Sequence, residues 1–296
     1  MSVSTVGVIG AGQMGAGVAQ VAAQAGVKVV LNDVSEELCL RGLDGIERNL
    51  DRMIQRGRFK PEERDRVIQR IETSSRLEDL REVDFVLEAV VESEEAKIGL
   101  FQKLDKICPP DVIFASNTSS ISITRMGART SRADRFIGMH FMNPVPAMKL
   151  VEIIRGLATS QETYEVTRAL AEKLGKNTMT AEDFPGFIVN RILLPMINEA
   201  IYTLYEGVGG VTDIDMAMKL GTNQPMGPLE LADLIGLDTC LAIMEVMHRV
   251  FGDDKYRPCP LLKKYVDAGY LGRKAGRGFY TYDAHGNLIP PPAPGR

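Results

Sequence analysis

A glycine-rich run near the N-terminus has the residue types and spacing of a nucleotide-binding turn. Residues 10–15 read GAGQMG, after the apolar run 5–9 and before an alanine-rich stretch. In such a turn the first glycine permits the reversal, the second lets the backbone approach a pyrophosphate, and the third lets helix and strand pack closely. The start of the helix also offers free N–H groups to the phosphates. The residues expected around the phosphates are Gly10, Gly12, Gln13, Met14 and Gly15.

Asp33 has the position expected of the acid that completes such a site. It follows the second apolar run, near the customary offset of about 20 residues, where a carboxylate accepts hydrogen bonds from both ribose hydroxyls. The same charge would repel a 2′-phosphate, so we expect NAD rather than NADP. Two alternatives stay open: a purely structural glycine turn, and an Asp33 that is only a solvated turn residue.

His140 is the first candidate for the chemistry itself. It follows the apolar run 136–139 and precedes the turn 143–146, which reads NPVP. Ligands of open α/β sheets bind outside the carboxyl ends of the strands. An imidazole, with an unperturbed pKa of about 6.5, suits proton exchange near neutral pH. His140 is therefore a candidate general base, although a histidine near a strand end can also be structural.

Glu152 interrupts the apolar run 150–154, where an unpaired carboxylate would cost several kcal/mol to bury. The turn 143–146 brings this strand back beside the previous one, so His140 is the nearest partner that we expect. A carboxylate on one ring nitrogen fixes the tautomer and leaves the other nitrogen to exchange a proton with the substrate. The alternative is an edge strand with Glu152 in water.

Two more polar residues are candidates for substrate binding. Ser119 follows the apolar run 112–115, and Asn190 lies among apolar residues at the start of the C-terminal part. Either side chain could donate a hydrogen bond to a substrate oxygen in an interdomain cleft. Ser119 could instead cap a helix, and Asn190 could bridge two helices.

A helical hairpin is expected between the second and third strands of the N-terminal half. Apolar residues recur there at helical spacing, and Pro61 suits the first position of the second helix. Arg48, Arg52 and Arg56 recur every four residues on the opposite face. This basic ridge could bind the phosphates of a bulky substrate, or it could be a solvated helix face.

The elements that must position these residues alternate between strands and helices up to about residue 154. Apolar runs separated by helical stretches predict parallel βαβ units, and runs that are apolar on both sides predict a sheet covered on both faces. We therefore expect a Rossmann-type, doubly wound α/β sheet. Its strands are expected at 5–9, 27–31, 85–90, 112–115, 136–139 and 150–154.

The strand pattern stops at residues 183–186, and an all-α domain is expected beyond them. Pro185 suits a first helical position, and Thr212 with Asp215 resembles a capping box for a helix that Gly221 would end. Further helices are expected at about 228–235 and 238–250. The predicted domains are 1–184, an NAD-binding domain, and 185–283, a helical domain, followed by a loose tail at 284–296.

Composition excludes several classes of protein. The 296 residues include 35 Lys and Arg against 39 Asp and Glu, a formal net charge of −4, which argues against a broad nucleic-acid-binding surface. No apolar run approaches the ~18 residues of a membrane span. The cysteines Cys39, Cys108, Cys240 and Cys259 lack metal-ligand spacing, so we expect reduced thiols, no metal site and a cytoplasmic protein.

Over nearly the whole chain the sequence resembles the L-3-hydroxyacyl-CoA dehydrogenases, close to the bacterial 3-hydroxybutyryl-CoA dehydrogenases. Five segments carry the resemblance: VIGAGQMG at 8–15, ASNTSS at 115–120, GMHFMNPVP at 138–146, PGFIVNR at 185–191 and GRGFY at 276–280. The resemblance implies NAD-dependent oxidation of an (S)-3-hydroxyacyl-CoA to the 3-ketoacyl-CoA, or the reverse reduction. It also implies a homodimer formed through the helical domain.

The resemblance also implies roles for individual residues. His140 and Glu152 would be the catalytic pair, and Ser119 and Asn190 would hold the C3 oxygen and the thioester region. The implied NAD contacts are Asp33, Glu92, Lys97, Asn143 and Lys274, and the implied CoA contacts are Asn49 and Arg56 on the helical insertion. Three positions depart from the family: Met142 replaces the usual phenylalanine, Asn49 stands where some members have serine, and Arg56 stands where they have lysine.

The sequence leaves two alternative functions open. The same scaffold could oxidise a non-CoA hydroxy acid or a polyol, because related folds exchange substrates through their second domain. A protein that binds NAD without turnover belongs to a different class. NADH oxidation with acetoacetyl-CoA, compared with simple keto acids, discriminates among these possibilities.

Overall fold

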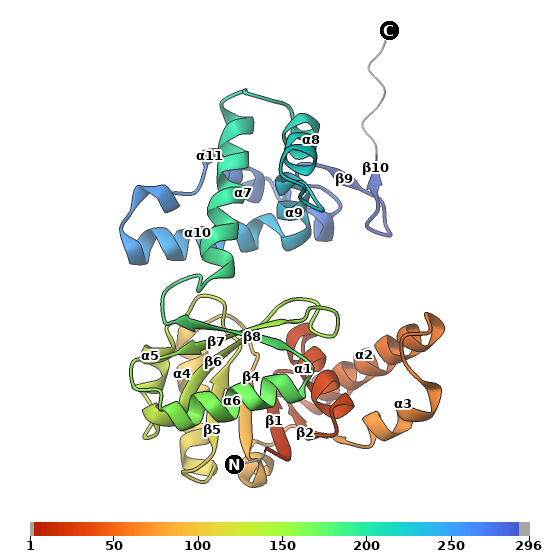
Figure 1. Ribbon diagram of the computed structural model, residues 1–296, viewed down its shortest axis with the longest axis vertical. Helices are drawn as coiled ribbons and strands as arrows, with labels where there is room; N and C mark the ends of the chain where they lie inside the picture. The colour runs from red at the N-terminus through yellow and green to blue at the C-terminus, as the bar shows by residue number, and fades with distance from the viewer. Residues whose placement is uncertain (1–2, 290–296) are drawn as a thin grey trace. The chain divides into compact units, whose positions relative to one another are not determined.

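The computed structural model describes residues 3–289, and the chain divides into two compact units, Met1–Phe187 and Ile188–Arg296 (Figure 1). The first unit contains an eight-stranded sheet with the order β3-β2-β1-β4-β5-β6-β7-β8. The strands from β3 to β6 pair in parallel, β6 and β7 pair antiparallel, and β7 and β8 pair in parallel. The strands are β1 Thr5–Ile9, β2 Lys28–Asn32, β3 Ile71–Ser74, β4 Phe85–Glu88, β5 Ile113–Ser116, β6 Phe136–Phe141, β7 Leu150–Arg155 and β8 Asn177–Glu182.

Successive residues of these strands pack into two different cores, one on each face of the sheet. In β1, Val8 belongs to the cluster that includes α1 and α6, whereas Ile9 belongs to the cluster that includes α4 and α5. Ile113 and Phe114 of β5 alternate in the same way. Helices therefore cover both faces, which confirms the doubly wound α/β arrangement. The helices of this unit are α1 Gln13–Gln24, α2 Glu36–Gln55, α3 Pro61–Ile68, α4 Glu94–Ile107, α5 Ile123–Gly127 and α6 Gln161–Lys173, with short 3₁₀ turns η1 Leu77–Glu82 and η2 Ala133–Arg135.

The expected helical hairpin is formed by α2 and α3, which project together from one end of the sheet (Figure 1). The hydroxyl of Ser35 caps α2 by accepting from the N–H of Leu38 at 3.3 Å, and Pro61 occupies the start of α3. Ile46 and Leu50 bury the apolar side of α2 in the sheet core. The hairpin therefore presents its other side, with the basic ridge, to solvent.

The second unit is helical around a core of its own. Its helices are α7 Val189–Tyr205, α8 Val211–Gly221, α9 Pro228–Ile235, α10 Leu237–Phe251 and α11 Pro260–Asp267, with 3₁₀ turns η3 Asp254–Tyr256 and η4 Arg273–Ala275 and a small hairpin of β9 Thr281–Tyr282 and β10 Leu288–Ile289. Part of the segment expected as a loose tail is thus the second strand of this hairpin. The rest of that segment, 290–296, lies outside the described residues.

Two local predictions for this unit are wrong. Thr212 and Asp215 form no capping box: α8 begins after Gly210 without a side-chain cap. The Asp215 carboxylate instead accepts from the N–H groups of Leu229 and Glu230 at 2.8 and 2.9 Å, so it caps α9. Pro185 lies in a turn, because α7 begins only at Val189.

Within the described part of the chain, no helix has the length and apolar character needed to cross a membrane. The same residues contain no group of three or more His, Cys, Asp or Glu side chains that could hold a metal ion.

Candidate active site

The glycine-rich turn has the backbone geometry that its sequence requires. Gly10 adopts a φ of +99°, and a Cβ there would lie 2.5 Å from the carbonyl oxygen of Ala89. A Cβ on Gly15 would lie 1.7 Å from the carbonyl oxygen of Gly10, so the start of α1 packs directly on the turn. The space around Gly12 is open, with nothing within 4 Å of a Cβ position. A ligand can therefore approach the backbone at the middle glycine.

A cavity of about 340 Å³ opens between this turn and α2. Asp33 lines it together with Gly12, Gln13 and Arg41. Two backbone N–H groups fix the Asp33 carboxylate: that of Ala11 donates to Oδ2 at 2.7 Å, and that of Val34 donates to Oδ1 at 2.7 Å. A carboxylate offers about four acceptor positions, so two of them remain for ligand hydroxyls. The cavity, the open glycine and the oriented acid fit the adenosine half of a dinucleotide.

His140 and Glu152 form a close pair within the sheet. They are directly opposite each other in the antiparallel register of β6 and β7. Nδ1 of His140 lies 2.7 Å from Oε2 of Glu152, and the carboxylate side chain is only 1% exposed. The edge-strand alternative with Glu152 in water is therefore wrong. The ring of Phe187 lies against the imidazole, with 5.6 Å between the ring centroids.

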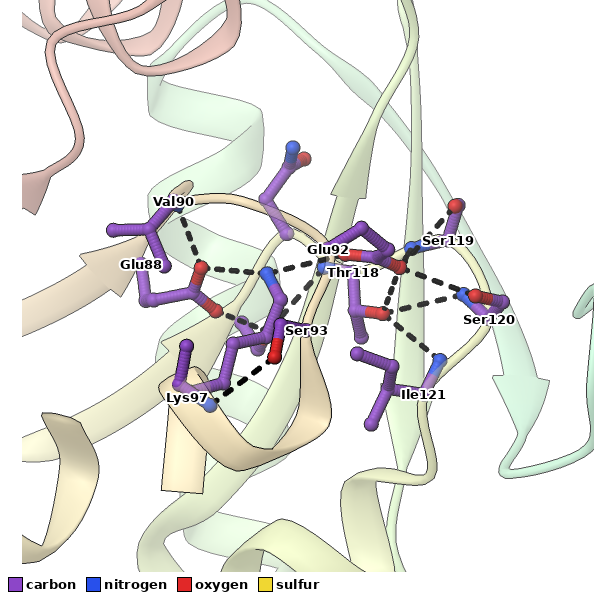
Figure 2. Close-up of polar contacts among 12 residues, drawn as sticks. Glu88, Val90, Glu92, Ser93, Lys97, Thr118, Ser119, Ser120 and Ile121 are labelled. Carbon is purple, nitrogen blue, oxygen red and sulfur yellow. Dashed lines mark hydrogen bonds and ion pairs between the residues drawn. The ribbon is translucent and has the colours of Figure 1, made fainter. Parts of the chain in front are cut away.

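Ser119 lies in a network of polar contacts around Glu92 (Figure 2). Oε1 of Glu92 accepts from the hydroxyl of Thr118 at 2.5 Å, from the N–H of Ser119 at 3.0 Å and from the hydroxyl of Ser119 at 3.4 Å. Oε2 lies 3.2 Å from Nζ of Lys97. Burial opposes ionisation of Glu92, but the charge of Lys97 and these hydrogen bonds prevail, so the pKa of Glu92 is lowered.

Asn143 is held at the start of the turn that follows β6. Its Oδ1 accepts from Nε2 of Gln13 in the glycine-rich turn at 3.0 Å. Further along the same turn, the buried ammonium of Lys176 donates to the carbonyls of Val145 and Met148 at 2.6 and 2.8 Å. The turn is thus anchored both to the start of α1 and to the start of β8.

The two implied CoA contacts have different surroundings on α2. Asn49 donates from Nδ2 to Oε1 of Gln20 at 2.8 Å, which ties α2 to α1. Arg56 is exposed, as are Arg48 and Arg52. The neighbouring acids Glu47 and Asp51 pair with Arg64 of α3 at 3.0 and 2.7 Å.

Two of the predicted site residues belong to the second unit. Asn190 is in the first turn of α7, and Lys274 is in η4. Nζ of Lys274 lies 2.6 Å from Oδ1 of Asp238 near the start of α10. The first unit holds the remaining predicted residues. It brings His140 and Glu152 into contact. In a second group, Glu92 contacts both Ser119 and Lys97.

Two family models cover the chain. The NAD binding domain of 3-hydroxyacyl-CoA dehydrogenase matches residues 5–184, and the C-terminal domain of the same enzyme matches residues 186–282. The chain belongs to the 3-hydroxyacyl-CoA dehydrogenase family. The resemblance seen in the sequence motifs is confirmed, and so is NAD as the cofactor.

Individual relatives resemble this dehydrogenase over almost their whole length. It is 59% identical over 280 residues to a 3-hydroxybutyryl-CoA dehydrogenase of Bradyrhizobium diazoefficiens, covering 95% of this chain and 96% of that protein. It is 57% identical over 283 residues to a probable 3-hydroxybutyryl-CoA dehydrogenase of Bacillus subtilis, covering 96% and 99%. The crystal structure of the (S)-3-hydroxybutyryl-CoA dehydrogenase of Ralstonia eutropha matches with a TM-score of 0.93 at 51% identity, covering 95% and 100%.

Sequence reasoning missed three side chains that shape this dehydrogenase site. Glu88 ends β4 fully buried and pairs with Lys97 at 2.6 Å. Asn117 accepts from the N–H of Phe141 at 2.8 Å, which ties the serine-rich loop to the strand of His140. Lys176 anchors the turn after that strand. Asn117 lies within a motif that signals the family, whereas the burial of Glu88 and Lys176 has no signal in the sequence.

Proposed function

We propose that this dehydrogenase interconverts (S)-3-hydroxybutyryl-CoA and acetoacetyl-CoA. The activity of the family, oxidation of a 3-hydroxyacyl-CoA with NAD, follows from the two domain matches. The choice of a four-carbon acyl chain is supported by the names of its relatives at 59% and 57% identity. The observation that carries the chemistry is the contact of 2.7 Å between His140 and Glu152.

In this proposal His140 is the general base. Its Nδ1 is held by Glu152, so Nε2 is the nitrogen that takes the proton of the C3 hydroxyl. Bound NAD supplies the acceptor for the C3 hydride. In the reverse direction the imidazolium, stabilised by Glu152, returns the proton to the C3 oxygen. General acid–base catalysis of this type contributes about 10²- to 10⁴-fold to the rate.

The binding residues are assigned by the same proposal. Ser119 and Asn190 hold the C3 oxygen and the thioester region, and Asn49 and Arg56 contact CoA. The exposed arginines on α2 and at its C-cap support the CoA assignment, because phosphates bind readily to clustered guanidinium groups. The residues proposed to contact NAD are Gly10, Gly12, Gln13, Met14, Gly15, Asp33, Glu92, Lys97, Asn143 and Lys274.

The proposal includes a homodimer formed through the helical unit and a cytoplasmic location. Large apolar side chains are exposed on α7, α8 and the turn between them, among them Ile192, Val208 and Leu220. Exposed apolar residues of this kind are typical of surfaces that associate. The cytoplasmic location is supported by the cysteines, which are all buried free thiols.

A substrate series tests the proposed activity. NADH oxidation is followed with 3-ketoacyl-CoA substrates from four to sixteen carbons and, as the control, with free acetoacetate. We expect the highest kcat/KM with acetoacetyl-CoA and little turnover of the free acid. A preference for the longest chains would reject the short-chain assignment, and equal turnover of free acetoacetate would favour a non-CoA substrate. NADH binding without turnover of any substrate would indicate a non-catalytic NAD-binding protein.

A further inference from the structure

A fully buried carboxylate lies beside the site without a role in the reaction described above. Glu88 ends β4, and its carboxylate contacts the loop that follows β4 and Lys97 of α4 (Figure 2). Its Oε1 accepts from the N–H of Val90 at 2.7 Å and from Nζ of Lys97 at 2.6 Å, and its Oε2 accepts from the hydroxyl of Ser116 at 2.6 Å. Three donors therefore hold the carboxylate of Glu88 in one orientation.

Lys97 links this carboxylate to the residues around the substrate. Its side chain is 1% exposed, and its ammonium lies between Glu88 and Glu92, at 2.6 and 3.2 Å. Glu92, with 40% of its side chain exposed, reaches outward to Ser119. Although burial opposes ionisation, the ammonium of Lys97 and the donors of the serine-rich loop lower the pKa of Glu92, so its carboxylate accepts hydrogen bonds from that loop.

We propose that Glu88 is a positioning residue of the dehydrogenase, acting on the substrate through Lys97, Glu92 and Ser119. Glu88 fixes the ammonium of Lys97, the ammonium fixes Oε2 of Glu92, and Oε1 of Glu92 fixes the loop through the backbone N–H of Ser119. This inference rests on the proposed function, in which Ser119 holds the C3 oxygen. A loop that is misplaced by a fraction of an ångström loses alignment with the reacting carbon.

A buried ion pair could instead serve only the fold. Such pairs are weak evidence for stability, because desolvation offsets most of the attraction. The two roles differ in what they predict. A structural role lowers the thermal midpoint and leaves turnover per folded molecule unchanged, whereas a positioning role lowers turnover only while Ser119 is present to be positioned.

The test is a double-mutant cycle between Glu88→Gln and Ser119→Ala, measured as kcat/KM for acetoacetyl-CoA at saturating NADH. Gln keeps the size of Glu88, can accept from Lys97 and can donate to Ser116, so it removes the charge with little change in shape. We expect Glu88→Gln alone to lower kcat/KM roughly tenfold, within the range of couplings between residues in one network. In the Ser119→Ala background we expect it to cost less than about twofold.

Glu94→Gln is the matched control. Glu94 begins α4, the helix that carries Lys97, but it pairs on the surface with Arg125. This variant should leave kcat/KM unchanged. Circular dichroism and thermal midpoints report the folded fraction of each variant. If Glu88→Gln does not fold, Ser116→Ala takes its place in the cycle, since it removes one donor to Glu88 without changing any charge.

The outcomes separate the inference from the proposed function. Losses that multiply across the cycle, or a lower midpoint with unchanged turnover, would overturn the positioning role of Glu88. A wild-type protein that does not oxidise NADH with acetoacetyl-CoA would instead overturn the proposed function itself.

Discussion

At the scale of single residues, the proposed reaction depends on which nitrogen of His140 faces the substrate. Nδ1 is in contact with Oε2 of Glu152, so only Nε2 remains to interact with a substrate. A carboxylate in this position favours the tautomer that carries its proton on Nδ1 and stabilises the imidazolium when it forms. In the proposed mechanism, Nε2 therefore serves as the base in oxidation and, once protonated, as the acid in reduction.

Replacing His140 by Gln tests this directly. Gln cannot take up the proton, so we expect kcat for acetoacetyl-CoA reduction to fall by about 10²- to 10⁴-fold. The dissociation constant for NADH, measured by fluorescence, should change little. His248→Gln is the control, because His248 is the partly exposed partner of Asp254 on the second unit. Undiminished turnover in the His140→Gln variant would show that His140 is not the general base.

The cysteines should be inert in the native protein. Burial raises the pKa of Cys108 to about 11 and that of Cys240 to about 12, and Cys39 and Cys259 are buried as well. At pH 8 about one Cys108 thiol in a thousand is ionised, and only the thiolate reacts. Labelling with an aromatic disulfide should therefore be far slower in the native than in the denatured protein. Native thiols that react as fast as free cysteine would contradict this.

The parts of the site that sequence reasoning predicts are those fixed by local connections. The NPVP turn brings two consecutive strands together, so the pairing of His140 with Glu152 follows from position along the chain. Glu88 could not be predicted in this way. A glutamate at a strand end resembles a solvated residue, and its partner Lys97 lies on a helix whose rotation only the folded core determines.

At the scale of elements, the strands that were predicted are those with continuous apolar runs. β3 and β8 were missed because they lie at the two edges of the sheet and bury few side chains: β8 reads NTMTAE, with Ala181 as its one buried residue. Edge strands are paired on one side only, so their residues need not be apolar. The capping box predicted at Thr212 and Asp215 is wrong for a different reason. The carboxylate of Asp215 caps α9, which follows later in the chain, and not its own helix α8.

Asp215 should contribute to stability through α9 and through Tyr280, which precedes β9. It accepts from two N–H groups at the start of α9 and from the hydroxyl of Tyr280 at 2.9 Å. We expect Asp215→Ala to lower the free energy of unfolding by about 1–3 kcal/mol, since buried donors lose their acceptor. The exposed Thr212→Ala should stay within about 0.5 kcal/mol of wild type. Urea unfolding measures both, and equal effects would restore the capping-box interpretation.

At the scale of the whole molecule, each unit has its own core and its own family match. The N-terminal sheet carries the nucleotide cavity and the His140–Glu152 pair, and the helical unit carries Asn190 and Lys274. Related enzymes share a nucleotide-binding domain and differ in the substrates that their second domain accepts. The division of this chain into two units agrees with that pattern.

The proposed dimer is tested by light scattering. The expected mass is twice the 32.5 kDa of one chain. A charge on the helical unit should weaken association, so we expect Leu220→Lys to shift the mass toward the monomer at micromolar concentration. Leu157→Lys is the matched control, because Leu157 is also a highly exposed leucine but belongs to the first unit. A wild-type chain that is monomeric would show the dimer assignment to be wrong.

The antiparallel register of β6 and β7 also limits how the enzyme can vary. Side chains alternate between the faces of a sheet, so a register shift of one residue would send Glu152 to the face opposite His140 while the ladder of backbone hydrogen bonds persisted. Such a protein would lose its acid–base couple and would bury the carboxylate of Glu152 without its partner, at a cost of several kcal/mol. A change in the parity of the length of the connection at 142–149 would thus affect activity and stability together.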